Sequence, residues 1–229
     1  MWDLGLVGYS EAWELQKWLH RQRVGGKVSD VLLLLEHPPT LTIGKSGSVG
    51  NVLISKEQMA EQGLSLFFID RGGDVTYHGP GQLVGYPILD LRGRGEDLHQ
   101  YARNLEEVKL RTLRMFSIEA GRDASHPGVW ADREEIAAIG LSVRRWVTMH
   151  GFALNVNTNL DHFTCINPCG FSDRRATSMS KILRRTISME AVKEQVISHF
   201  RHTFGIPVTS GAVRPHRFKA ERSSGDRAC

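Results

Sequence analysis

Residues 71–82, the glycine-rich stretch, are Arg71-Gly72-Gly73-Asp74-Val75-Thr76-Tyr77-His78-Gly79-Pro80-Gly81-Gln82. Glycine accepts positive φ and lets another backbone or a ligand approach closely. Apolar runs flank this stretch at Leu66–Ile69 and Leu83–Leu91. The pattern predicts two strands joined by a loop at a sheet edge, where the loop lines a pocket and presents Arg71 and His78. A long tight turn without a binding role is the alternative.

Apolar periodicity and capping residues predict the elements on either side. Helices are predicted at residues 10–24 (with Ser10 as the N-cap), 55–63, 97–115, 178–183 and 188–204. Strands are predicted at 31–35, 40–43, 129–131, 136–139, 142–148 and 152–156, the last four as an antiparallel meander. Pro87 predicts a sheet edge or a bulge for the strand after the glycine-rich stretch.

Helices and strands mix without a regular β-α-β repeat, so we expect an α+β fold: a single domain with a mixed β-sheet flanked by helices. Residues 1–209 are expected to form this domain, and residues 210–229 a disordered basic tail. At 41% hydrophobic and 24% charged residues, the composition is that of a globular domain.

The chain shows no long apolar run of the kind that spans a membrane and no recognisable leader at its start. We therefore expect a cytoplasmic protein that does not bind a membrane. The net charge is +4, but the basic residues form no long stripe, so nucleic-acid binding is not expected. A basic surface favours acidic protein partners instead.

The three cysteines, Cys165, Cys169 and Cys229, lack disulfide spacing, which indicates a reducing compartment. No second Cys/His pair accompanies Cys165 and Cys169, so no metal site is expected. Cys169 lies in Ile166-Asn167-Pro168-Cys169-Gly170, where the local backbone is constrained, and is a candidate nucleophile. A buried structural cysteine is the alternative, and it is the interpretation that we favour for Cys165.

The polar residues of the glycine-rich stretch suit acyl chemistry. Arg71 and the N–H groups of Gly72 and Gly73 are suited to bind an oxyanion, and His78 to accept a thiol proton. A lone histidine such as His78 or His150 is more often structural. Neither a phosphate-binding loop nor a dinucleotide fingerprint is present, so we expect no nucleotide and no other cofactor. A thiol without ATP favours transfer of an already activated acyl group through a thioester.

Four segments together carry a resemblance to a known family. They are the glycine-rich stretch, Glu135-Ile136-Ala137-Ala138-Ile139-Gly140, His150-Gly151-Phe152-Ala153-Leu154-Asn155, and Ile166–Gly170. In order and spacing, from about Leu32 to Ile182, the chain resembles the LipB family, the octanoyltransferases of lipoate biosynthesis. The resemblance implies the fold shared by biotin–protein and lipoate–protein ligases.

The resemblance also implies a reaction and partners. LipB-like enzymes take an octanoyl group from octanoyl-acyl carrier protein onto a cysteine, here Cys169. They pass it to a lysine of lipoyl domains, such as those of 2-oxoacid dehydrogenases and the glycine cleavage H protein. The implied substrate-binding residues are Arg71, Gly72, Gly73, Asp74, Val75, Thr76, Tyr77, His78, Ala138, Ile139, Gly140, His150, Gly151, Phe152 and Ala153.

At one position the chain departs from the family. The family places a lysine directly before the Ile-x-x-Ile/Leu-Gly segment, where its charge lowers the thiol pKa, and Glu135 occupies that position here. A carboxylate near a thiol acts with the opposite sign and raises the thiol pKa. A tenfold smaller thiolate fraction corresponds to about 1.4 kcal/mol.

Three accounts of Glu135 stay open at this point. The carboxylate acts as a general base while His78 or His150 activates the thiol; a nearby cation, Arg133 or Lys181, takes the role of the lysine; or the chain is inactivated. Two other functions are therefore alternatives to octanoyl transfer. One is an amidotransferase that moves lipoyl or octanoyl groups between protein domains, and the other is a catalytically silent acyl-binding protein.

Overall fold

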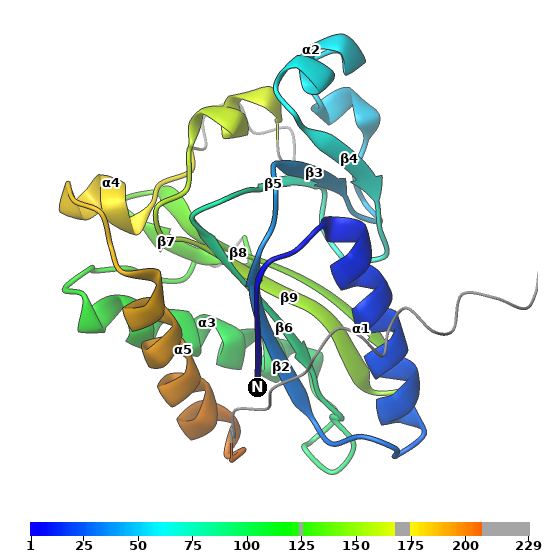
Figure 1. The fold of residues 1–229 in the computed structure, drawn as a ribbon. Helices are drawn as coiled ribbons and strands as arrows, with labels where there is room; N and C mark the ends of the chain where they lie inside the picture. Colours follow the sequence, from blue (N-terminus) through cyan, green and yellow to red (C-terminus); the bar gives the residue numbers. More distant parts are fainter. Residues whose placement is uncertain (124–125, 168–174, 208–229) are drawn as a thin grey trace, which may run out of the picture.

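The structure, a computed structural model, describes residues 1–123, 126–167 and 175–207 (Figure 1). Its main element is a six-stranded sheet with the strand order β1-β2-β6-β9-β8-β7. The strands are β1 (Trp2–Leu6), β2 (Val31–Glu36), β6 (Gln82–Ile88), β9 (Val147–Asn155), β8 (Glu134–Arg144) and β7 (Val129–Ala131). The pair β1–β2 is parallel and the other pairs are antiparallel, so the sheet is mixed.

Helices cover both faces of this sheet (Figure 1). Helix α1 packs on one face, while α3 and α5 pack on the other. The helices are α1 (Tyr9–Val24), α2 (Lys56–Glu61), α3 (Leu98–Met115), α4 (Met179–Leu183) and α5 (Met189–Phe204), with short 3-10 turns η1 (Val49–Asn51) and η2 (Asp161–Cys165). In the described part of the chain, no helix combines the length and the apolar character that a membrane crossing needs.

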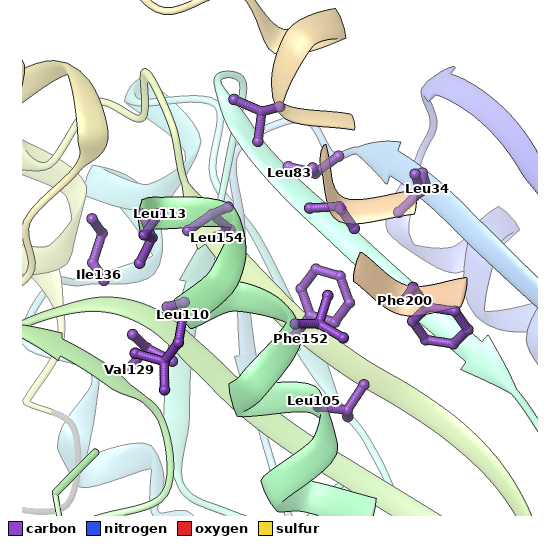
Figure 2. Packing of buried hydrophobic residues seen from close by; sticks show 14 of the residues in the cluster. Leu34, Leu83, Leu105, Leu110, Leu113, Val129, Ile136, Phe152, Leu154 and Phe200 are labelled. Carbon is purple, nitrogen blue, oxygen red and sulfur yellow. The ribbon is translucent and has the colours of Figure 1, made fainter. Parts of the chain in front are cut away.

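Strand β2 is apolar on both faces because both are covered by helices. Leu33 and Leu35 pack in the cluster on the α1 side, while Leu32 and Leu34 pack in the cluster below α3 and α5. Figure 2 shows Leu34 in the latter cluster, together with Phe200 from α5. Each such side chain stabilises the fold by about 2 kcal/mol when it is fully buried.

A second, three-stranded sheet follows the order β4-β3-β5. Strand β3 (Thr40–Ile43) lies in its middle, parallel to β4 (Ser65–Phe68) and antiparallel to β5 (Val75–His78). The α+β fold with helices around mixed strands is thus confirmed, although the strands form two sheets where one was expected. Strand β5 lies inside the glycine-rich stretch.

The predicted pair of strands joined by one loop is wrong. The apolar run at Leu66–Ile69 supplies β4 of the small sheet, and the run at Leu83–Leu91 supplies β6 of the large one. Strand β5 is hard to predict because it is only four residues long and lies between glycines. Its signal is a short alternation, in which Val75 and Tyr77 are buried in the cluster beneath the small sheet.

Strands β8 and β9 form one long hairpin, so the predicted breaks at Gly140 and Gly151 are wrong. These two glycines lie opposite each other inside the strands. The turn is at Arg145 and Trp146, with φ of 51° and 61°. Gly151 serves a close approach of strands instead, since a β-carbon there would lie 2.2 Å from the carbonyl oxygen of Gly85. The antiparallel order β7-β8-β9 is confirmed.

Pro87 lies inside the sheet, which contradicts the predicted edge position. It is paired with Leu32 of β2, while β9 lies on the other side of β6. The missing N–H is tolerated because the regular β6–β9 pairing ends at Gly85. Thr148 bridges the interruption: its hydroxyl donates to the Pro87 carbonyl at 2.7 Å and accepts from the N–H of Leu89 at 2.9 Å.

Most of the predicted helix starts are confirmed by side-chain caps. The capping residues that accept backbone N–H bonds are Ser55 (in a capping box with Gln58), Asp97, Ser178 and Ser188. Ser10 is the exception, because α1 starts at Tyr9 after Gly8, which has no side chain to cap it. The predicted domain end at residue 209 lies outside the described residues, as does the predicted tail.

Candidate functional site

Arg71 connects the glycine-rich stretch to both sheets. Its side chain is 8% exposed, and Nη2 donates to the carbonyl and hydroxyl oxygens of Thr42 at 2.8 and 2.9 Å. The N–H of Gly72, predicted to face an oxyanion, donates to the carbonyl of Leu141 at 2.7 Å. A β-carbon on Gly140 would lie 2.7 Å from Cδ of Arg71. Glycine at position 140 therefore makes room for the arginine.

Asp74 ties the stretch to the first end of the Cys169 segment. Its carboxylate accepts from the N–H of Ser48 at 3.2 Å and from the side-chain amide of Asn51 at 2.5 Å. The carbonyl of Asn51 accepts from the N–H of Asn167 at 2.8 Å. Cys169 itself lies outside the described residues, but Asn167, two positions before it, is held next to the stretch.

His78 begins a second chain of hydrogen bonds, which reaches the other end of that segment. Its Nδ1 donates to Oε1 of Gln82 at 2.8 Å, and the Gln82 amide donates to Asn155 at 2.9 Å. The amide of Asn155 donates to the Thr177 carbonyl at 3.0 Å. The N–H of Thr177 donates to the carbonyl of Glu135 at 2.9 Å. Hydrogen bonds thus link His78, which was predicted to line the pocket, to Glu135, which stands where the family has a lysine.

Glu135 binds the C-terminal end of the Cys169 segment through its backbone. Its N–H donates to the Arg175 carbonyl at 2.9 Å. Of the two cations suggested as a replacement for the family lysine, Lys181 binds the neighbouring Glu134 at 2.9 and 3.0 Å. Arg133 is exposed in the β7–β8 turn, with φ of 67°.

A buried aromatic cluster lies beside His78 and was not predicted from the sequence. His37 is fully buried; its Nδ1 donates to the carbonyl of Val7 at 2.8 Å, and its Nε2 accepts from the Tyr86 hydroxyl at 2.7 Å. The ring of Tyr9 lies 4.9 Å from that of His37 and 5.8 Å from that of His78. The available signal was a histidine followed by two prolines directly after a buried strand.

Burial keeps both histidines neutral at pH 7. Desolvation lowers the pKa of His78 to about 3, and the neighbouring His37 and Arg71 add to the effect. Desolvation also lowers the pKa of His37 to about 4. A neutral His78 whose Nδ1–H is already donated acts as a hydrogen-bonding group rather than as a strong base.

His150 is hydrogen-bonded to Asp70, which was not among the predicted site residues. Its Nε2 donates to Asp70 Oδ1 at 3.0 Å, and this hydrogen bond is the main reason why the carboxyl pKa of Asp70 lies well below its ordinary value. Desolvation nevertheless lowers the pKa of His150. Its backbone N–H donates to Gln16 at 2.8 Å, and its φ is 56°. Position next to Arg71 was the only sequence signal for Asp70.

The predicted residues of β8 and β9 divide between the two faces of the sheet. Ala138 is paired with Ala153, which packs on the α1 side of the sheet. Arg71 lies on the same side, against Gly140. Ile139 is paired with Phe152, and both pack in the core below α3. Figure 2 shows Phe152 among the aliphatic side chains of that core. Phe152 and Ile139 therefore face away from Arg71.

Two further observations concern the second cysteine, Cys165, and the predicted pocket. Cys165 is buried beneath the small sheet, and burial raises its pKa, which confirms its packing role. A surface hollow of about 630 Å³ lies between Met1, Asp30 and Phe200. None of the predicted site residues lines that hollow.

Comparisons with known proteins identify the family and similar proteins. The family described as lipoyl protein ligase A/B catalytic domain matches residues 8–201. An octanoyltransferase of Desulforamulus reducens is 48% identical over 202 residues, which are 88% of this chain and 89% of that protein. An octanoyltransferase of Caldicellulosiruptor bescii is 50% identical over 204 residues, 88% of this chain and 90% of that protein.

Solved structures with low identity share the fold. Lipoate-protein ligase A bound with ATP gives a TM-score of 0.72 at 18% identity, covering 93% of this chain and 88% of that chain. A bi-partite lipoate protein ligase from Thermoplasma acidophilum gives 0.71 at 16% identity, covering 93% and 86%. Biotin protein ligase from Aquifex aeolicus gives 0.53 at 15% identity, covering 90% and 69%.

Proposed function

Since the chain belongs to the lipoyl protein ligase A/B catalytic domain family, we propose that it is an octanoyltransferase of lipoate biosynthesis. It takes an octanoyl group from acyl carrier protein onto Cys169 and passes it to a lysine of a lipoyl domain. Such partners belong to the 2-oxoacid dehydrogenases and the glycine cleavage H protein, and the reaction takes place in the cytoplasm. No cofactor takes part.

One observation supports this assignment most strongly. Both described ends of the Cys169 segment are tethered to the residues that the sequence singled out: Asn167 through Asn51 to Asp74, and Thr177 through Asn155 and Gln82 to His78. These hydrogen bonds hold Asn167 and Thr177, which flank the segment, close to the glycine-rich stretch. Their position supports the proposal that Cys169 acts together with that stretch.

The reaction has two acyl transfers. The Cys169 thiolate attacks the octanoyl thioester; the new C–S bond forms, the donor's C–S bond breaks, and the donor thiol takes up the proton. The lysine amine then attacks the enzyme thioester, an amide C–N bond forms, and Cys169 leaves as a thiol after proton transfer from the amine. The neutral His78 and the Asp70–His150 pair, which hold the stretch in place, are proposed to position the acyl carbonyl.

Mass spectrometry of the chain after incubation with octanoyl-acyl carrier protein tests the proposal. We expect an increase of about 126 Da on Cys169, the mass of an octanoyl group replacing a proton. Cys169→Ser should abolish the adduct, whereas Cys165→Ser, which changes a buried packing thiol, should keep it. An adduct that persists in Cys169→Ser contradicts the assignment of the nucleophile.

The same experiment separates the two alternatives. An acyl-binding protein without activity binds octanoate but forms no adduct. An amidotransferase forms the adduct when octanoylated lipoyl domain, instead of the carrier protein, is the donor. The departure at Glu135 is the observation that keeps both alternatives in the test.

A further inference from the structure

Exposed basic side chains gather next to the C-terminal end of the Cys169 segment. Lys181 of α4 binds Glu134 at 2.9 Å, which places α4 beside the start of β8 (Figure 1). Arg175, the first described residue after Cys169, lies at the same place, because its carbonyl accepts from the N–H of Glu135 at 2.9 Å. The exposed side chains of this basic surface are Arg133, Arg175, Lys181, Arg184 and Arg185.

The positive charge of the basic surface is only partly balanced. Lys181 is bound to Glu134, and the other carboxylates of the same turn and strand are those of Asp132 and Glu135. Among the described residues, no acidic side chain forms an ion pair with any arginine of the basic surface. Exposed charges of this kind attract an acidic protein over a distance and orient it as it approaches.

Apolar side chains are exposed at the other end of the Cys169 segment. Val49 is 57% exposed and Leu53 is 58% exposed. The N–H of Leu53 donates to the Cys165 carbonyl at 2.8 Å, and Asn51, between the two apolar residues, accepts from the N–H of Asn167. Val49 and Leu53 thus lie beside the N-terminal end of the segment.

One partner of ordinary size can cover both ends of the segment. Asn167 and Arg175 are eight residues apart, so at most about 28 Å separates them. A standard interface buries about 800 Å² on each partner, which is roughly 30 Å across. Apolar side chains next to a charged rim are the usual composition of such an interface.

We propose that the basic surface, together with Val49 and Leu53, is the docking surface for the octanoyl donor, a carrier protein with an acidic face. The inference rests on the proposed function. That reaction has a single donor but several acceptor proteins, so a fixed arrangement of charges suits the donor. The acidic face of the donor contacts the arginines, and its acyl thioester reaches Cys169.

The matched pair Arg184→Glu and Arg145→Glu tests where this surface lies. Both arginines are exposed and have positive φ, 53° and 51°. Arg145 follows the far end of β8, whose 11 residues put about 35 Å between Arg145 and Glu134. The measurement is the rate at which octanoyl-acyl carrier protein forms the Cys169 adduct, at about 0.05 M and about 1 M salt.

Arg184→Glu should form the adduct about tenfold more slowly than the parent at low salt. At about 1 M salt, where the screening length is about 3 Å, the two rates should be similar. Arg145→Glu should match the parent at both salt concentrations. Equal losses in the two variants show a general effect of net charge and overturn the inference, as does a parent-like rate for Arg184→Glu at low salt.

A small donor separates docking from chemistry. With octanoyl-N-acetylcysteamine, a thioester that carries no protein, both variants should form the adduct at the rate of the parent. A slower reaction of Arg184→Glu with this donor shows an effect on the thiol itself and overturns the inference. A loss confined to transfer from octanoylated Cys169 to the lipoyl domain assigns the surface to the acceptor and overturns it as well.

Binding without turnover separates this inference from the proposed function. Titration calorimetry of octanoyl-acyl carrier protein into Cys169→Ser should give a dissociation constant that Arg184→Glu raises about tenfold and Arg145→Glu leaves unchanged. If the parent forms the adduct but all three dissociation constants are equal, only the docking surface is overturned. A parent that forms no adduct but shows the difference in binding supports the docking surface and contradicts the proposed function.

Discussion

The two faces of the central sheet bury polar groups in different ways. On the α1 side, the side chains of His37, His78 and Tyr86 are buried next to one another and are hydrogen-bonded. On the α3 side, leucine and phenylalanine side chains form an apolar core (Figure 2). This side also buries Lys109, whose Nζ lies 4.9 Å from the ring centroid of Phe152 and has no hydrogen-bond partner in the described residues. The comparison teaches that a hydrogen-bonded polar cluster is compatible with burial in a neutral state, whereas an amine without such bonds depends on charge alone.

The largest effect is expected from the α3-side core. Phe200→Ala should lower the free energy of unfolding by about 3–5 kcal/mol, because it leaves a cavity where α5 meets the sheet. Urea denaturation measures the change. Met115→Ala, on an exposed residue of α3, is the control and should stay within about 0.5 kcal/mol of the parent. A loss below about 1 kcal/mol for Phe200→Ala means that α5 is not part of this core.

Acidification should destabilise the fold through the buried histidines on the α1 side of the sheet. The pKa of His37 is about 4 in the folded chain and about 6.5 in an unfolded chain, so only the unfolded state takes up a proton between these values. The contribution of His37 to stability is therefore full above pH about 6.5 and falls by about 3 kcal/mol as the pH drops to about 4. His78, with a pKa of about 3, adds a loss of the same sign. Urea midpoints across this range test the sign.

The control for this pH effect is an exposed histidine. Replacing His99, which lies at the start of α3, by Gln should leave the slope unchanged. Replacing His37 by Phe should make the slope smaller, while His78 keeps a slope of the same sign. If stability rises on acidification, His37 is not held neutral.

A smaller effect is expected where Arg71 crosses the α1 side of β8. Gly140→Ala places a methyl group 2.7 Å from Cδ of Arg71, whose guanidinium is anchored on Thr42. We expect a loss of about 1–3 kcal/mol in thermal unfolding and a slower octanoyl transfer. Ala138→Gly removes a methyl group from the same face and is the comparison. A parent-like transfer rate for Gly140→Ala removes Arg71 from the proposed site.

The smallest effect is expected at α2, which lies on neither face. Ser55→Ala removes the capping box with Gln58 and should cost about 1 kcal/mol by urea denaturation. The transfer rate and its pH profile should stay unchanged. A larger loss would mean that α2 supports the small sheet more strongly than its exposed side chains indicate.

The predictions from sequence succeeded where the signal is local. Strand β7 was predicted with its observed bounds, and Asp97 caps α3 as expected, because a cap depends on a few adjacent residues. They failed at Gly140 and Gly151, because the sequence does not distinguish a glycine in a turn from a glycine that leaves room for a neighbouring residue. They failed at Pro87, because only a partner strand shows whether an N–H is needed.

By itself, the sequence determined the helices, most of the strands, the family and the motif residues, because periodicity, caps and motif spacing are properties of neighbouring residues. Only the tertiary structure decided that Asp74 and His78 reach the two ends of the Cys169 segment through hydrogen bonds, and that the Lys109 side chain is buried below the sheet. Gln82 and Asn155, which carry the hydrogen bonds from His78, are far apart in the chain and belong to two strands. Their contact depends on how β6 pairs with β9, and no local pattern encodes that pairing.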